Sequence, residues 1–348
     1  MRALSVIPGQ LDSASVDEWP DPPESDGSIL VEGLLMGVCG TDVEISADGY
    51  GWAPPGEKLL VLGHESLGKV LSAPADSAFT TGDLVVGVVR RPDPVPCPWC
   101  ANLEWDMCSN GQYTERGIKQ RHGYGATQWR AEPSFLVPVP ASLGHTGILL
   151  EPAAVVAKVW EQVEHIGRRA TYAPRHVLVT GAGPVGLLAA LLGVQRGLDV
   201  HVLDTAADGI KPQLVTDLGA TYHHEGVAKL GFEPDIVIEG TGLGSLLLTV
   251  LQELAPNGIV GLAGLSASGR TVDAPMDAIN KQMVLRNQVV VGSVNEAYRH
   301  YHQAAEALAS ADFQWLSRLI TKTVPMQEWP TALTKGPQDV KVVVDLQA

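Results

Sequence analysis

A glycine-rich turn between an apolar strand and an apolar helix constrains the fold of this chain more than any other feature. The pattern predicts a strand over His176–Thr180 and a helix over Gly186–Arg196, joined by Gly181-Ala-Gly-Pro-Val-Gly186. A G-x-G-x-x-G motif in this context is typical of dinucleotide-binding domains. A glycine turn that binds no ligand is the alternative interpretation.

Each glycine of this motif has a separate physical task. Gly181 permits the tight turn, Gly183 lets the backbone approach a pyrophosphate, and Gly186 lets helix and strand pack closely. The helix N-terminus supplies N–H groups and a positive dipole to the phosphates. The cofactor-binding residues predicted from the motif are Gly181, Gly183, Pro184, Val185 and Gly186.

Asp204 follows the next predicted strand, 23 residues after Gly181, and bears on the choice of cofactor. An acidic residue there accepts hydrogen bonds from the adenosine ribose and repels a 2′-phosphate, which favours NAD over NADP. Lys211 weakens this preference, because its side chain could reach either a ribose hydroxyl or a 2′-phosphate. We therefore expect Asp204 and Lys211 to contact the cofactor, with NAD preferred and NADP as the alternative.

From residue 176 onward, short apolar strands alternate with helical segments. The further strands expected are Asp199–Leu203, Asp235–Glu239, Gly258–Ala263 and Gln288–Val294, and the further helices are Gln213–Leu218 and Ser245–Leu254. This alternation predicts βαβ units and a parallel sheet. Continuous apolar strands fit a sheet that is covered on both faces. The fold class predicted for this half is α/β, with a doubly wound parallel sheet.

The first 150 residues predict short strands separated by Gly, Pro and Asp. The strands expected there are Ile29–Val38, Lys58–Val61, Gly68–Leu71, Leu84–Val89 and Phe135–Val139. Four prolines in Pro92–Pro98 exclude a helix or a central strand, so a loop is expected. Towards the C-terminus we expect a helix over Glu296–Ser310 and a strand over Asp339–Leu346 that returns to the first domain.

The composition fits a folded protein and argues against two classes of partner. Hydrophobic residues make up 45% of the 348 residues, and the formal net charge is −15. Such a surface repels nucleic acid and anionic lipid. The N-terminus shows no apolar run of signal-peptide length, and no stretch approaches the roughly 20 apolar residues of a membrane span. We therefore expect a cytoplasmic protein with neither nucleic acid nor membrane as a partner.

Cys39, His64 and Glu151 are candidate ligands of a catalytic zinc ion. Such an ion takes three protein ligands of N, S or O type and keeps one position open. Taken singly, each residue has a structural alternative: an inert buried cysteine, a core histidine or an acid at a helix N-terminus. Their combination upstream of a nucleotide-binding segment favours the metal site.

Three of the four cysteines, Cys97, Cys100 and Cys108, lie within twelve residues. Clustering of this kind indicates metal binding in a reducing compartment rather than a disulfide framework. The C-x2-C-x7-C spacing predicts a structural zinc site. Asp93 is the best candidate for the fourth ligand, with a water molecule or no bound metal as alternatives.

Together these motifs resemble the medium-chain dehydrogenase/reductase superfamily, and within it the microbial glucose 1-dehydrogenases, along essentially the whole chain. The superfamily motifs are Cys39-Gly-Thr-Asp42, Leu62-Gly-His-Glu65, Gly82-Asp83 and the Gly181–Gly186 turn. Motifs more specific to the branch are Val88-Val-Arg-Arg-Pro92, Tyr113-Thr-Glu-Arg-Gly-Ile118, His122-Gly-Tyr124, Leu150-Glu-Pro152, Gly219-Ala-Thr-Tyr222 and Gly292-Ser-Val-Asn295. One departure is Pro94, which stands where the family's structural-zinc loop has its first cysteine.

The resemblance implies two domains and a set of site residues. A β-rich, GroES-like catalytic domain would comprise residues 1–153 and 296–348, and a Rossmann dinucleotide-binding domain residues 154–295. The implied ligands of the catalytic zinc are Cys39, His64 and Glu151, with Glu65 able to enter or leave the shell. The residues implied around the substrate are Thr41 against the reacting hydroxyl, Asp42 behind His64 as an orienting acid, and Glu115, Glu151 and Asn295 on the sugar.

The expected activity is zinc-dependent hydride transfer from a sugar hydroxyl, C1 of D-glucose or a related aldose, to NAD(P). A polyol, cyclitol or other secondary-alcohol dehydrogenase on the same scaffold is the nearest alternative, because substrate choice lies in loops. A zinc-independent quinone or enoyl reductase and a non-catalytic nucleotide sensor are disfavoured by the intact ligand set. The resemblance also implies a homo-oligomer, a dimer or tetramer, with the strand Gln288–Val294 as a candidate pairing edge.

Overall fold

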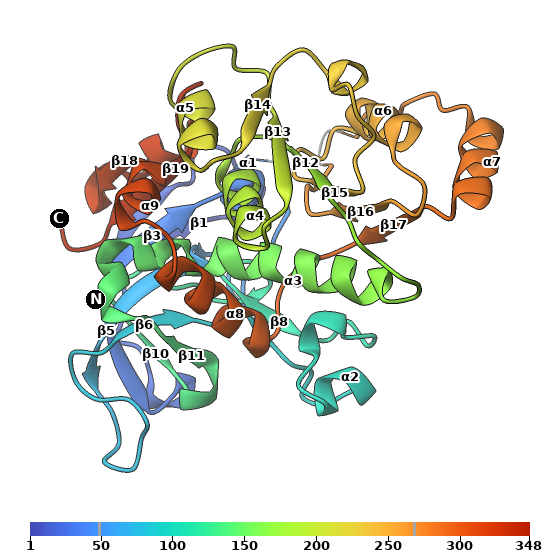
Figure 1. The fold of residues 1–348 in the computed structure, drawn as a ribbon. Helices are drawn as coiled ribbons and strands as arrows, with labels where there is room; N and C mark the ends of the chain where they lie inside the picture. The colour runs from blue at the N-terminus through green and yellow to red at the C-terminus, as the bar shows by residue number, and fades with distance from the viewer. Residues whose placement is uncertain (48–49, 267–268) are drawn as a thin grey trace. The chain divides into compact units, whose positions relative to one another are not determined.

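The chain forms two compact units, which are described separately below. The computed structural model describes residues 1–47, 50–266 and 269–348. Unit 1 comprises Met1–Ala154 and Asn295–Ala348, and unit 2 comprises Val155–Val294 (Figure 1). Helix α3 (Leu150–Gly167) begins in unit 1 and continues in unit 2. Within the described ranges, no helix combines the length and the apolar character needed to cross a membrane.

Unit 1 is built on a seven-stranded sheet with the order β11-β6-β5-β3-β19-β18, and β10 pairs with β3. The strands are β3 (Ile29–Val38), β5 (Glu65–Ser72), β6 (Leu84–Gly87), β10 (Gln128–Ala131), β11 (Leu136–Pro138), β18 (Ile320–Pro325) and β19 (Lys341–Asp345). The antiparallel pairing of β19 with β3 confirms that the C-terminal strand returns to the first domain. It also brings the end of the chain next to the strand that leads into Cys39.

Two three-stranded sheets and several helices complete unit 1. The small sheets are β2-β1-β4, formed by Ser15–Glu18, Arg2–Val6 and Leu60–Val61, and β7-β8-β9, formed by Arg90–Arg91, Thr114–Arg116 and Gln120–Arg121. The helices are α1 (Gly40–Ala47), α2 (Pro98–Ala101), α8 (Tyr298–Ala309) and α9 (Phe313–Leu319). The 3-10 helices are η1 (Glu24–Asp26), η2 (Trp105–Met107), η3 (Pro133–Phe135), η4 (Ala141–Leu149) and η6 (Met326–Leu333).

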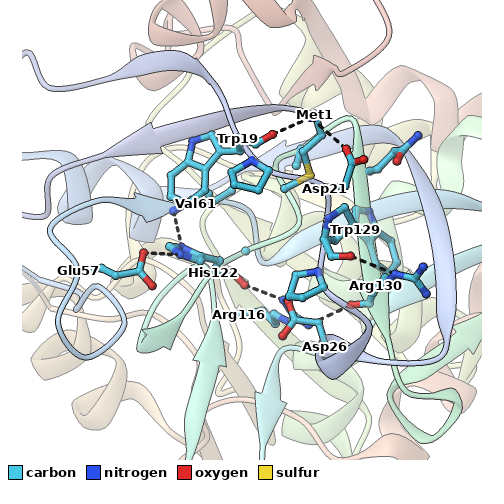
Figure 2. Close-up of a pocket in the computed structure, with 16 residues that line it drawn as sticks. Met1, Trp19, Asp21, Asp26, Glu57, Val61, Arg116, His122, Trp129 and Arg130 are labelled. Carbon is cyan, nitrogen blue, oxygen red and sulfur yellow. Dashed lines mark hydrogen bonds and ion pairs between the residues drawn. The ribbon is translucent and has the colours of Figure 1, made fainter.

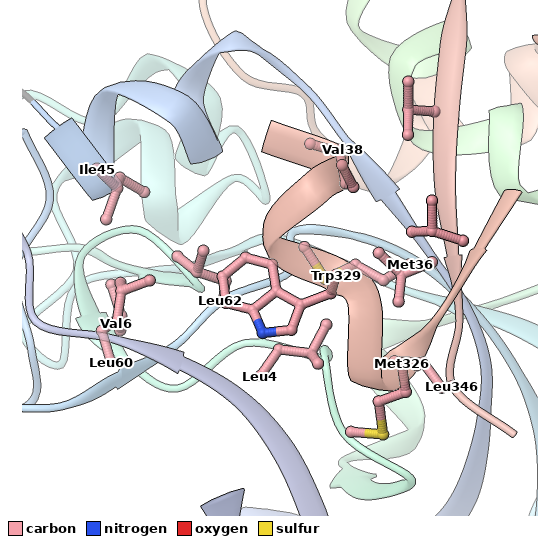
Figure 3. Packing of buried hydrophobic residues seen from close by; sticks show 14 of the residues in the cluster. Leu4, Val6, Met36, Val38, Ile45, Leu60, Leu62, Met326, Trp329 and Leu346 are labelled. Carbon is pink, nitrogen blue, oxygen red and sulfur yellow. The ribbon is translucent and has the colours of Figure 1, made fainter. Parts of the chain in front are cut away.

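Trp329 on η6 lies in a buried apolar cluster that joins both ends of unit 1 (Figure 3). Its fully buried ring belongs to the same cluster as Leu4 and Leu62 from the N-terminal segment and Met36 from β3. The indole Nε1 donates a hydrogen bond of 2.9 Å to the carbonyl oxygen of Ser15, so its polar atom is satisfied in the core. This packing holds β3, and therefore the residues that follow it, in a rigid setting.

Unit 2 contains the parallel sheet predicted from the alternating pattern. Its strand order is β14-β13-β12-β15-β16-β17, and all of its pairings are parallel. The strands are β12 (His176–Thr180), β13 (Asp199–Leu203), β14 (Thr221–His223), β15 (Ile236–Glu239), β16 (Ile259–Leu262) and β17 (Val289–Gly292). The helices are α4 (Pro184–Gln195), α5 (Ile210–Asp217), η5 (Val227–Lys229), α6 (Gly244–Glu253) and α7 (Met276–Arg286). The predicted α/β class is confirmed.

The structure differs from the expected elements in several places. Helix α4 begins at Pro184 rather than Gly186, because proline suits the first helical turn, where its missing N–H costs nothing. Helices α1, α3, α7 and α9 were not predicted. The loop expected over Pro92–Pro98 is correct except at its last residue, where the short helix α2 begins.

Candidate functional site

Cys39, His64 and Glu65, here called the Cys39 cluster, come together where two paired strands meet. Cys39 directly follows β3, and Glu65 opens β5 opposite Gly37 of β3 in the antiparallel register. The Cys39 Sγ lies 2.9 Å from His64 Nε2. One ligand atom from each of the three residues lies within 4.8 Å of the others. The chain thus assembles sulfur, nitrogen and oxygen donors of the kind that bind zinc.

Asp42 lies behind this cluster in the first turn of α1 and orients it. Its Oδ1 lies 3.4 Å from His64 Nδ1, and its Oδ2 accepts a 2.9 Å hydrogen bond from the backbone N–H of Cys39. Burial by itself would lower the pKa of His64. Negative charge on Cys39 and Asp42 outweighs this effect and raises the pKa well above its usual value. A carboxylate on the far nitrogen of a histidine leaves Nε2 facing the thiol, an arrangement typical of metal-binding histidines.

Lys341, which the sequence analysis did not single out, forms a buried ion pair with Glu65. The lysine is fully buried on β19, and Glu65 is almost as completely buried. Burial opposes the charge on Lys341, but the facing carboxylate of Glu65 raises the pKa of its ammonium group. A single lysine within the apolar stretch 340–344 was a signal in the sequence that a buried partner of opposite charge should exist.

Glu151, in the first turn of α3, lies near the Cys39 cluster without belonging to its tightest group of atoms. Burial and the neighbouring carboxylates of Glu296 and Glu65 raise its pKa well above the usual value. Glu296, fully buried and not singled out from the sequence, accepts a 2.5 Å hydrogen bond from the hydroxyl of Tyr301. Among the described residues, the compact three-ligand group contains Glu65 rather than Glu151.

The electrostatics of this region fit a bound divalent cation. Glu151 lies near the acidic groups of Glu296, Glu65 and Cys39 in a largely buried place, and burial and these like charges disfavour its ionisation. Within the described residues, Asp42 Oδ1 and His64 Nδ1 are buried without a hydrogen-bond partner, although each faces the other at ion-pair distance. A cation held by thiolate, imidazole and carboxylate would relieve the repulsion between the acids.

Glu115 and Asn295, the two residues expected on sugar hydroxyls, lie in contact. The Nδ2 of Asn295 lies 3.3 Å from Glu115 Oε1 as a hydrogen-bond donor. Asn295 has a left-handed backbone conformation, with φ of 57°, which asparagine tolerates better than most residues. Its Oδ1 is buried and accepts no hydrogen bond from the described part of the chain, so it is available to a hydroxyl donor.

Arg90 anchors this pair. Its Nε and Nη2 both donate to Glu115 Oε1, at 3.0 and 2.9 Å. Its guanidinium also stacks on the ring of Tyr113, 3.8 Å from the ring centre, and lies in the same buried region. A carboxylate held by a buried arginine keeps one orientation, so that Glu115 can present its remaining lone pairs to a ligand.

The glycine motif of unit 2 has the geometry expected of a phosphate-binding turn. Gly181 has φ of 88°, a conformation that favours glycine. A Cβ atom at Gly186 would clash with the carbonyl oxygen of Gly181, which explains why the helix needs glycine there. A Cβ at Gly183 would meet no atom of the described chain within 4 Å, which leaves the backbone open to a ligand.

Asp204 and Lys211 lie together beside this turn. The Asp204 carboxylate accepts a 2.6 Å hydrogen bond from the N–H of Ala182 and a 3.1 Å bond from the N–H of Ala206. The Nζ of Lys211 lies 3.8 Å from Asp204 Oδ2. The two residues predicted to select the cofactor are therefore coupled, because the lysine offsets part of the negative charge that would repel a phosphate.

Both halves of the chain match known families. Residues 25–141 match the alcohol dehydrogenase GroES-like domain, and residues 144–346 match the glucose dehydrogenase C-terminus. The glucose 1-dehydrogenases of Thermoproteus tenax and Methanocella arvoryzae are 39% and 37% identical to this chain, and each alignment covers 100% of both sequences. The chain belongs to the glucose dehydrogenase family.

A solved structure of this family has the same fold. Haloferax mediterranei glucose dehydrogenase, in complex with NADP, Zn and gluconolactone, superposes with a TM-score of 0.90 at 31% identity and covers 99% of both chains. The resemblance to glucose 1-dehydrogenases drawn from the sequence motifs is thereby confirmed. So is the GroES-like catalytic domain joined to a Rossmann-type domain.

This glucose dehydrogenase family member also brings Asp93 next to Cys108, one of its three clustered cysteines, and we call these four residues the cysteine loop. The Sγ of Cys108 lies 3.2 Å from Asp93 Oδ2, and Cys97, Cys100 and Cys108 form a compact group of donor atoms. Backbone N–H groups of Cys100 and Ser109 lower the pKa of Cys97 to about 6, which favours a thiolate at neutral pH. Burial raises the pKa of Cys100 to about 11. The group is free of disulfides and fits a metal ion with one oxygen and three sulfur donors.

A separate cavity of about 340 Å³ lies in unit 1 and contains none of the predicted site residues (Figure 2). Trp19, Trp129 and His122 line it together with Arg116 and Arg130. The His122 ring accepts a 3.2 Å hydrogen bond from the N–H of Val61 and pairs with Glu57 at 2.9 Å. The His122-Gly-Tyr124 motif therefore has a structural task here rather than a place in the Cys39 cluster.

Proposed function

We propose that this protein is a zinc- and NAD(P)-dependent sugar dehydrogenase that oxidises the C1 hydroxyl of D-glucose or a related aldose. The observation that carries the proposal is the Cys39 cluster, with its S, N and O donors backed by Asp42 and surrounded by buried acids. The family's Haloferax mediterranei member, in complex with NADP, Zn and gluconolactone, supports the substrate class, because gluconolactone is glucose oxidised at C1.

In this proposal Cys39, His64 and a carboxylate of Glu65 or Glu151 hold the metal. Zinc, when bound, acts as a Lewis acid that makes the substrate hydroxyl easier to deprotonate. Thr41 lies beside the thiol, because its backbone N–H donates to Cys39 Sγ at 3.3 Å. Its hydroxyl accepts the proton that leaves the substrate and relays it towards solvent. Asp42 keeps the His64 ring oriented towards the metal.

Glu115 and Asn295 orient the sugar. Arg90 holds Glu115, and Glu115 in turn accepts a hydrogen bond from Asn295. The two side chains exchange hydrogen bonds with the sugar hydroxyls and so discriminate against substrates that lack these hydroxyls. Unit 2 binds the cofactor. The turn Gly181–Gly186 holds its pyrophosphate, and its nicotinamide accepts the hydride. Asp204 and Lys211 contact the adenosine ribose.

The direct test is NAD(P)H formation, followed by absorbance, with a panel of aldoses, polyols and simple alcohols. Each substrate is tried with NAD and NADP, with and without a chelator. Chelator-sensitive turnover of glucose or a close aldose is expected. Turnover of a polyol or cyclitol alone would keep the mechanism and change the substrate. No turnover by protein that retains zinc would contradict the proposal.

We propose NAD as the preferred cofactor, with NADP also used. Asp204 disfavours a 2′-phosphate, and the nearby Lys211 reduces but does not remove that effect. Replacing Asp204 with Ala should raise the NADP-to-NAD ratio of kcat/KM, and Lys211→Ala should lower it. Opposite changes would contradict this assignment of the two side chains.

We also propose that the enzyme works in the cytoplasm as a homo-oligomer. The four cysteines are free, which suits a reducing compartment. Among the described strands, β17 pairs with β16 alone, and Leu285 in the preceding helix α7 and Val294 just after the strand are 70% and 63% exposed. A second copy pairing along β17 would cover these apolar side chains. Light scattering should give the mass of at least a dimer, and a monomer at micromolar concentration would contradict this.

A further inference from the structure

A group of histidine and aspartate side chains lies at the amino end of the sheet in unit 2. His176 is the first residue of β12, Asp199 is the first residue of β13, and the two are partners in the parallel register. His201, two residues along β13, lies on the same face as Asp199 because side chains alternate along a strand. One ligand atom from each lies within 4.8 Å of the others. These three residues are called the histidine cluster.

One possible ligand atom of this cluster, His201 Nε2, makes no hydrogen bond within the described chain. His176 Nδ1 lies 3.1 Å from Asp199 Oδ2, and His201 Nε2 lies 3.4 Å from Asp199 Oδ1. Within the described chain, His201 Nε2 is buried and makes no hydrogen bond. If this nitrogen carries its lone pair rather than a proton, the lone pair faces a carboxylate, and a bound cation would relieve that unfavourable contact.

His223, on the neighbouring strand β14, determines which nitrogen of His201 is available (strands β12, β13 and β14 in Figure 1). His201 Nδ1 and His223 Nε2 form a 2.8 Å hydrogen bond. If His201 Nδ1 is the donor, the lone pair of its Nε2 faces Asp199. Metal-binding histidines usually donate their other N–H to such a partner, which fixes the ring and its tautomer.

An aromatic ring packs against both imidazoles of the histidine cluster. The ring of Phe232 packs against both ligand rings, with centroids 4.9 Å from His176 and 4.2 Å from His201. An apolar neighbour of this kind limits the access of water and holds ligand rings in place.

We propose that His176, Asp199 and His201 form a binding site for a divalent transition-metal ion of the Zn²⁺ type. Two imidazoles and one carboxylate match the donors such ions prefer. The site lies at the amino ends of β12 and β13, whereas the glycine turn follows the carboxyl end of β12. The ion would link two adjacent strands without touching the cofactor, so its role is stabilisation rather than catalysis.

The test is zinc uptake by the active holoenzyme, dialysed to remove loose metal and then equilibrated with free Zn²⁺ buffered in the micromolar range. Metal content is measured by atomic emission for the wild type and for His176→Gln, Asp199→Asn and His201→Gln. His165→Gln is the matched control, since it removes an exposed histidine elsewhere in unit 2. Turnover of the same samples reports whether each variant is folded.

We expect the wild type and His165→Gln to take up one more zinc ion per chain than the three cluster variants. Added Zn²⁺ should also raise the Tm of the wild type and the control, but not of the cluster variants, because binding stabilises only the folded state. Equal uptake by all five proteins would overturn the proposal. Because His176 and Asp199 are 32% and 56% exposed, their variants keep the test valid if His201→Gln fails to fold.

Discussion

The Cys39 cluster and the cysteine loop both gather side chains that could hold a metal ion in unit 1, but they are built in opposite ways. The residues of the loop span only Asp93–Cys108, and a few short turns bring them together. The Cys39 cluster needs the ends of β3 and β5, and it is supported by Lys341 from the far end of the chain. One is therefore a local arrangement, and the other exists only after the sheet has formed.

The difference predicts how each region responds to substitution of its residues. A local loop should lose its metal and its own order while the rest of the unit stays folded. In the Cys39 cluster, activity depends on the folding of the whole sheet, because the charged residue that pairs with Glu65 is buried on another strand. Substitutions at these two places can therefore separate activity from stability.

Cys39→Ala should have the largest effect on activity. Removing a metal ligand should eliminate Lewis-acid assistance and lower kcat/KM by about 10³-fold or more, or roughly 4 kcal/mol of transition-state stabilisation. Cofactor binding, measured by fluorescence titration, should persist, because the glycine motif belongs to unit 2. A variant that remains active without bound zinc would show that the Cys39 cluster is not the reaction centre.

Lys341→Met should mainly reduce stability. It leaves the carboxylate of Glu65 buried without its cation, and breaking such a pair costs about 3 kcal/mol or more. Lys322→Met on the neighbouring strand β18 is the matched control, because its ammonium lies towards solvent and donates to the carbonyl of Thr331. Denaturant unfolding measures both variants, and equal losses would mean that the buried pair has no special weight.

Asp42→Asn should weaken metal binding without abolishing the fold. Loss of the carboxylate behind a metal-binding histidine typically lowers metal affinity by about 10–100-fold. Zinc affinity can be measured by competition with a chromophoric chelator, and adding excess Zn²⁺ should restore much of the turnover. An unchanged affinity would indicate that Asp42 acts only on the backbone of Cys39, through the bond at 2.9 Å.

Cys100→Ser should have the smallest effect on activity. We expect one zinc ion fewer per chain and a Tm lower by a few degrees, corresponding to about 1–2 kcal/mol. The value of kcat/KM should change little, because none of the four loop residues belongs to the Cys39 cluster. A loss of activity as large as that of Cys39→Ala would remove the contrast between the two regions.

The glycine motif, the parallel sheet and the Asp93–Cys108 group could be predicted because each depends on residues close together in the chain. The sequence also named Cys39, His64, Glu115 and Asn295, and the structure brings each of these pairs into contact. It did not indicate that Glu65 rather than Glu151 lies in the compact group, because that depends on strand register and on the start of α3.

By itself, the sequence determined the family, the fold class and the residue types available for chemistry, since these follow from motifs and periodicity. Only the tertiary structure decided that Lys341 faces Glu65, that Glu296 lies beside Glu151 and that Arg90 holds Glu115. The reason is physical: burying a charge is costly, so Glu65 and Glu115 depend on the cations that folding brings to them, whereas Glu296 beside Glu151 favours the protonated form of that acid. Those partners lie 276, 145 and 25 residues away along the chain, too far for a local pattern to predict.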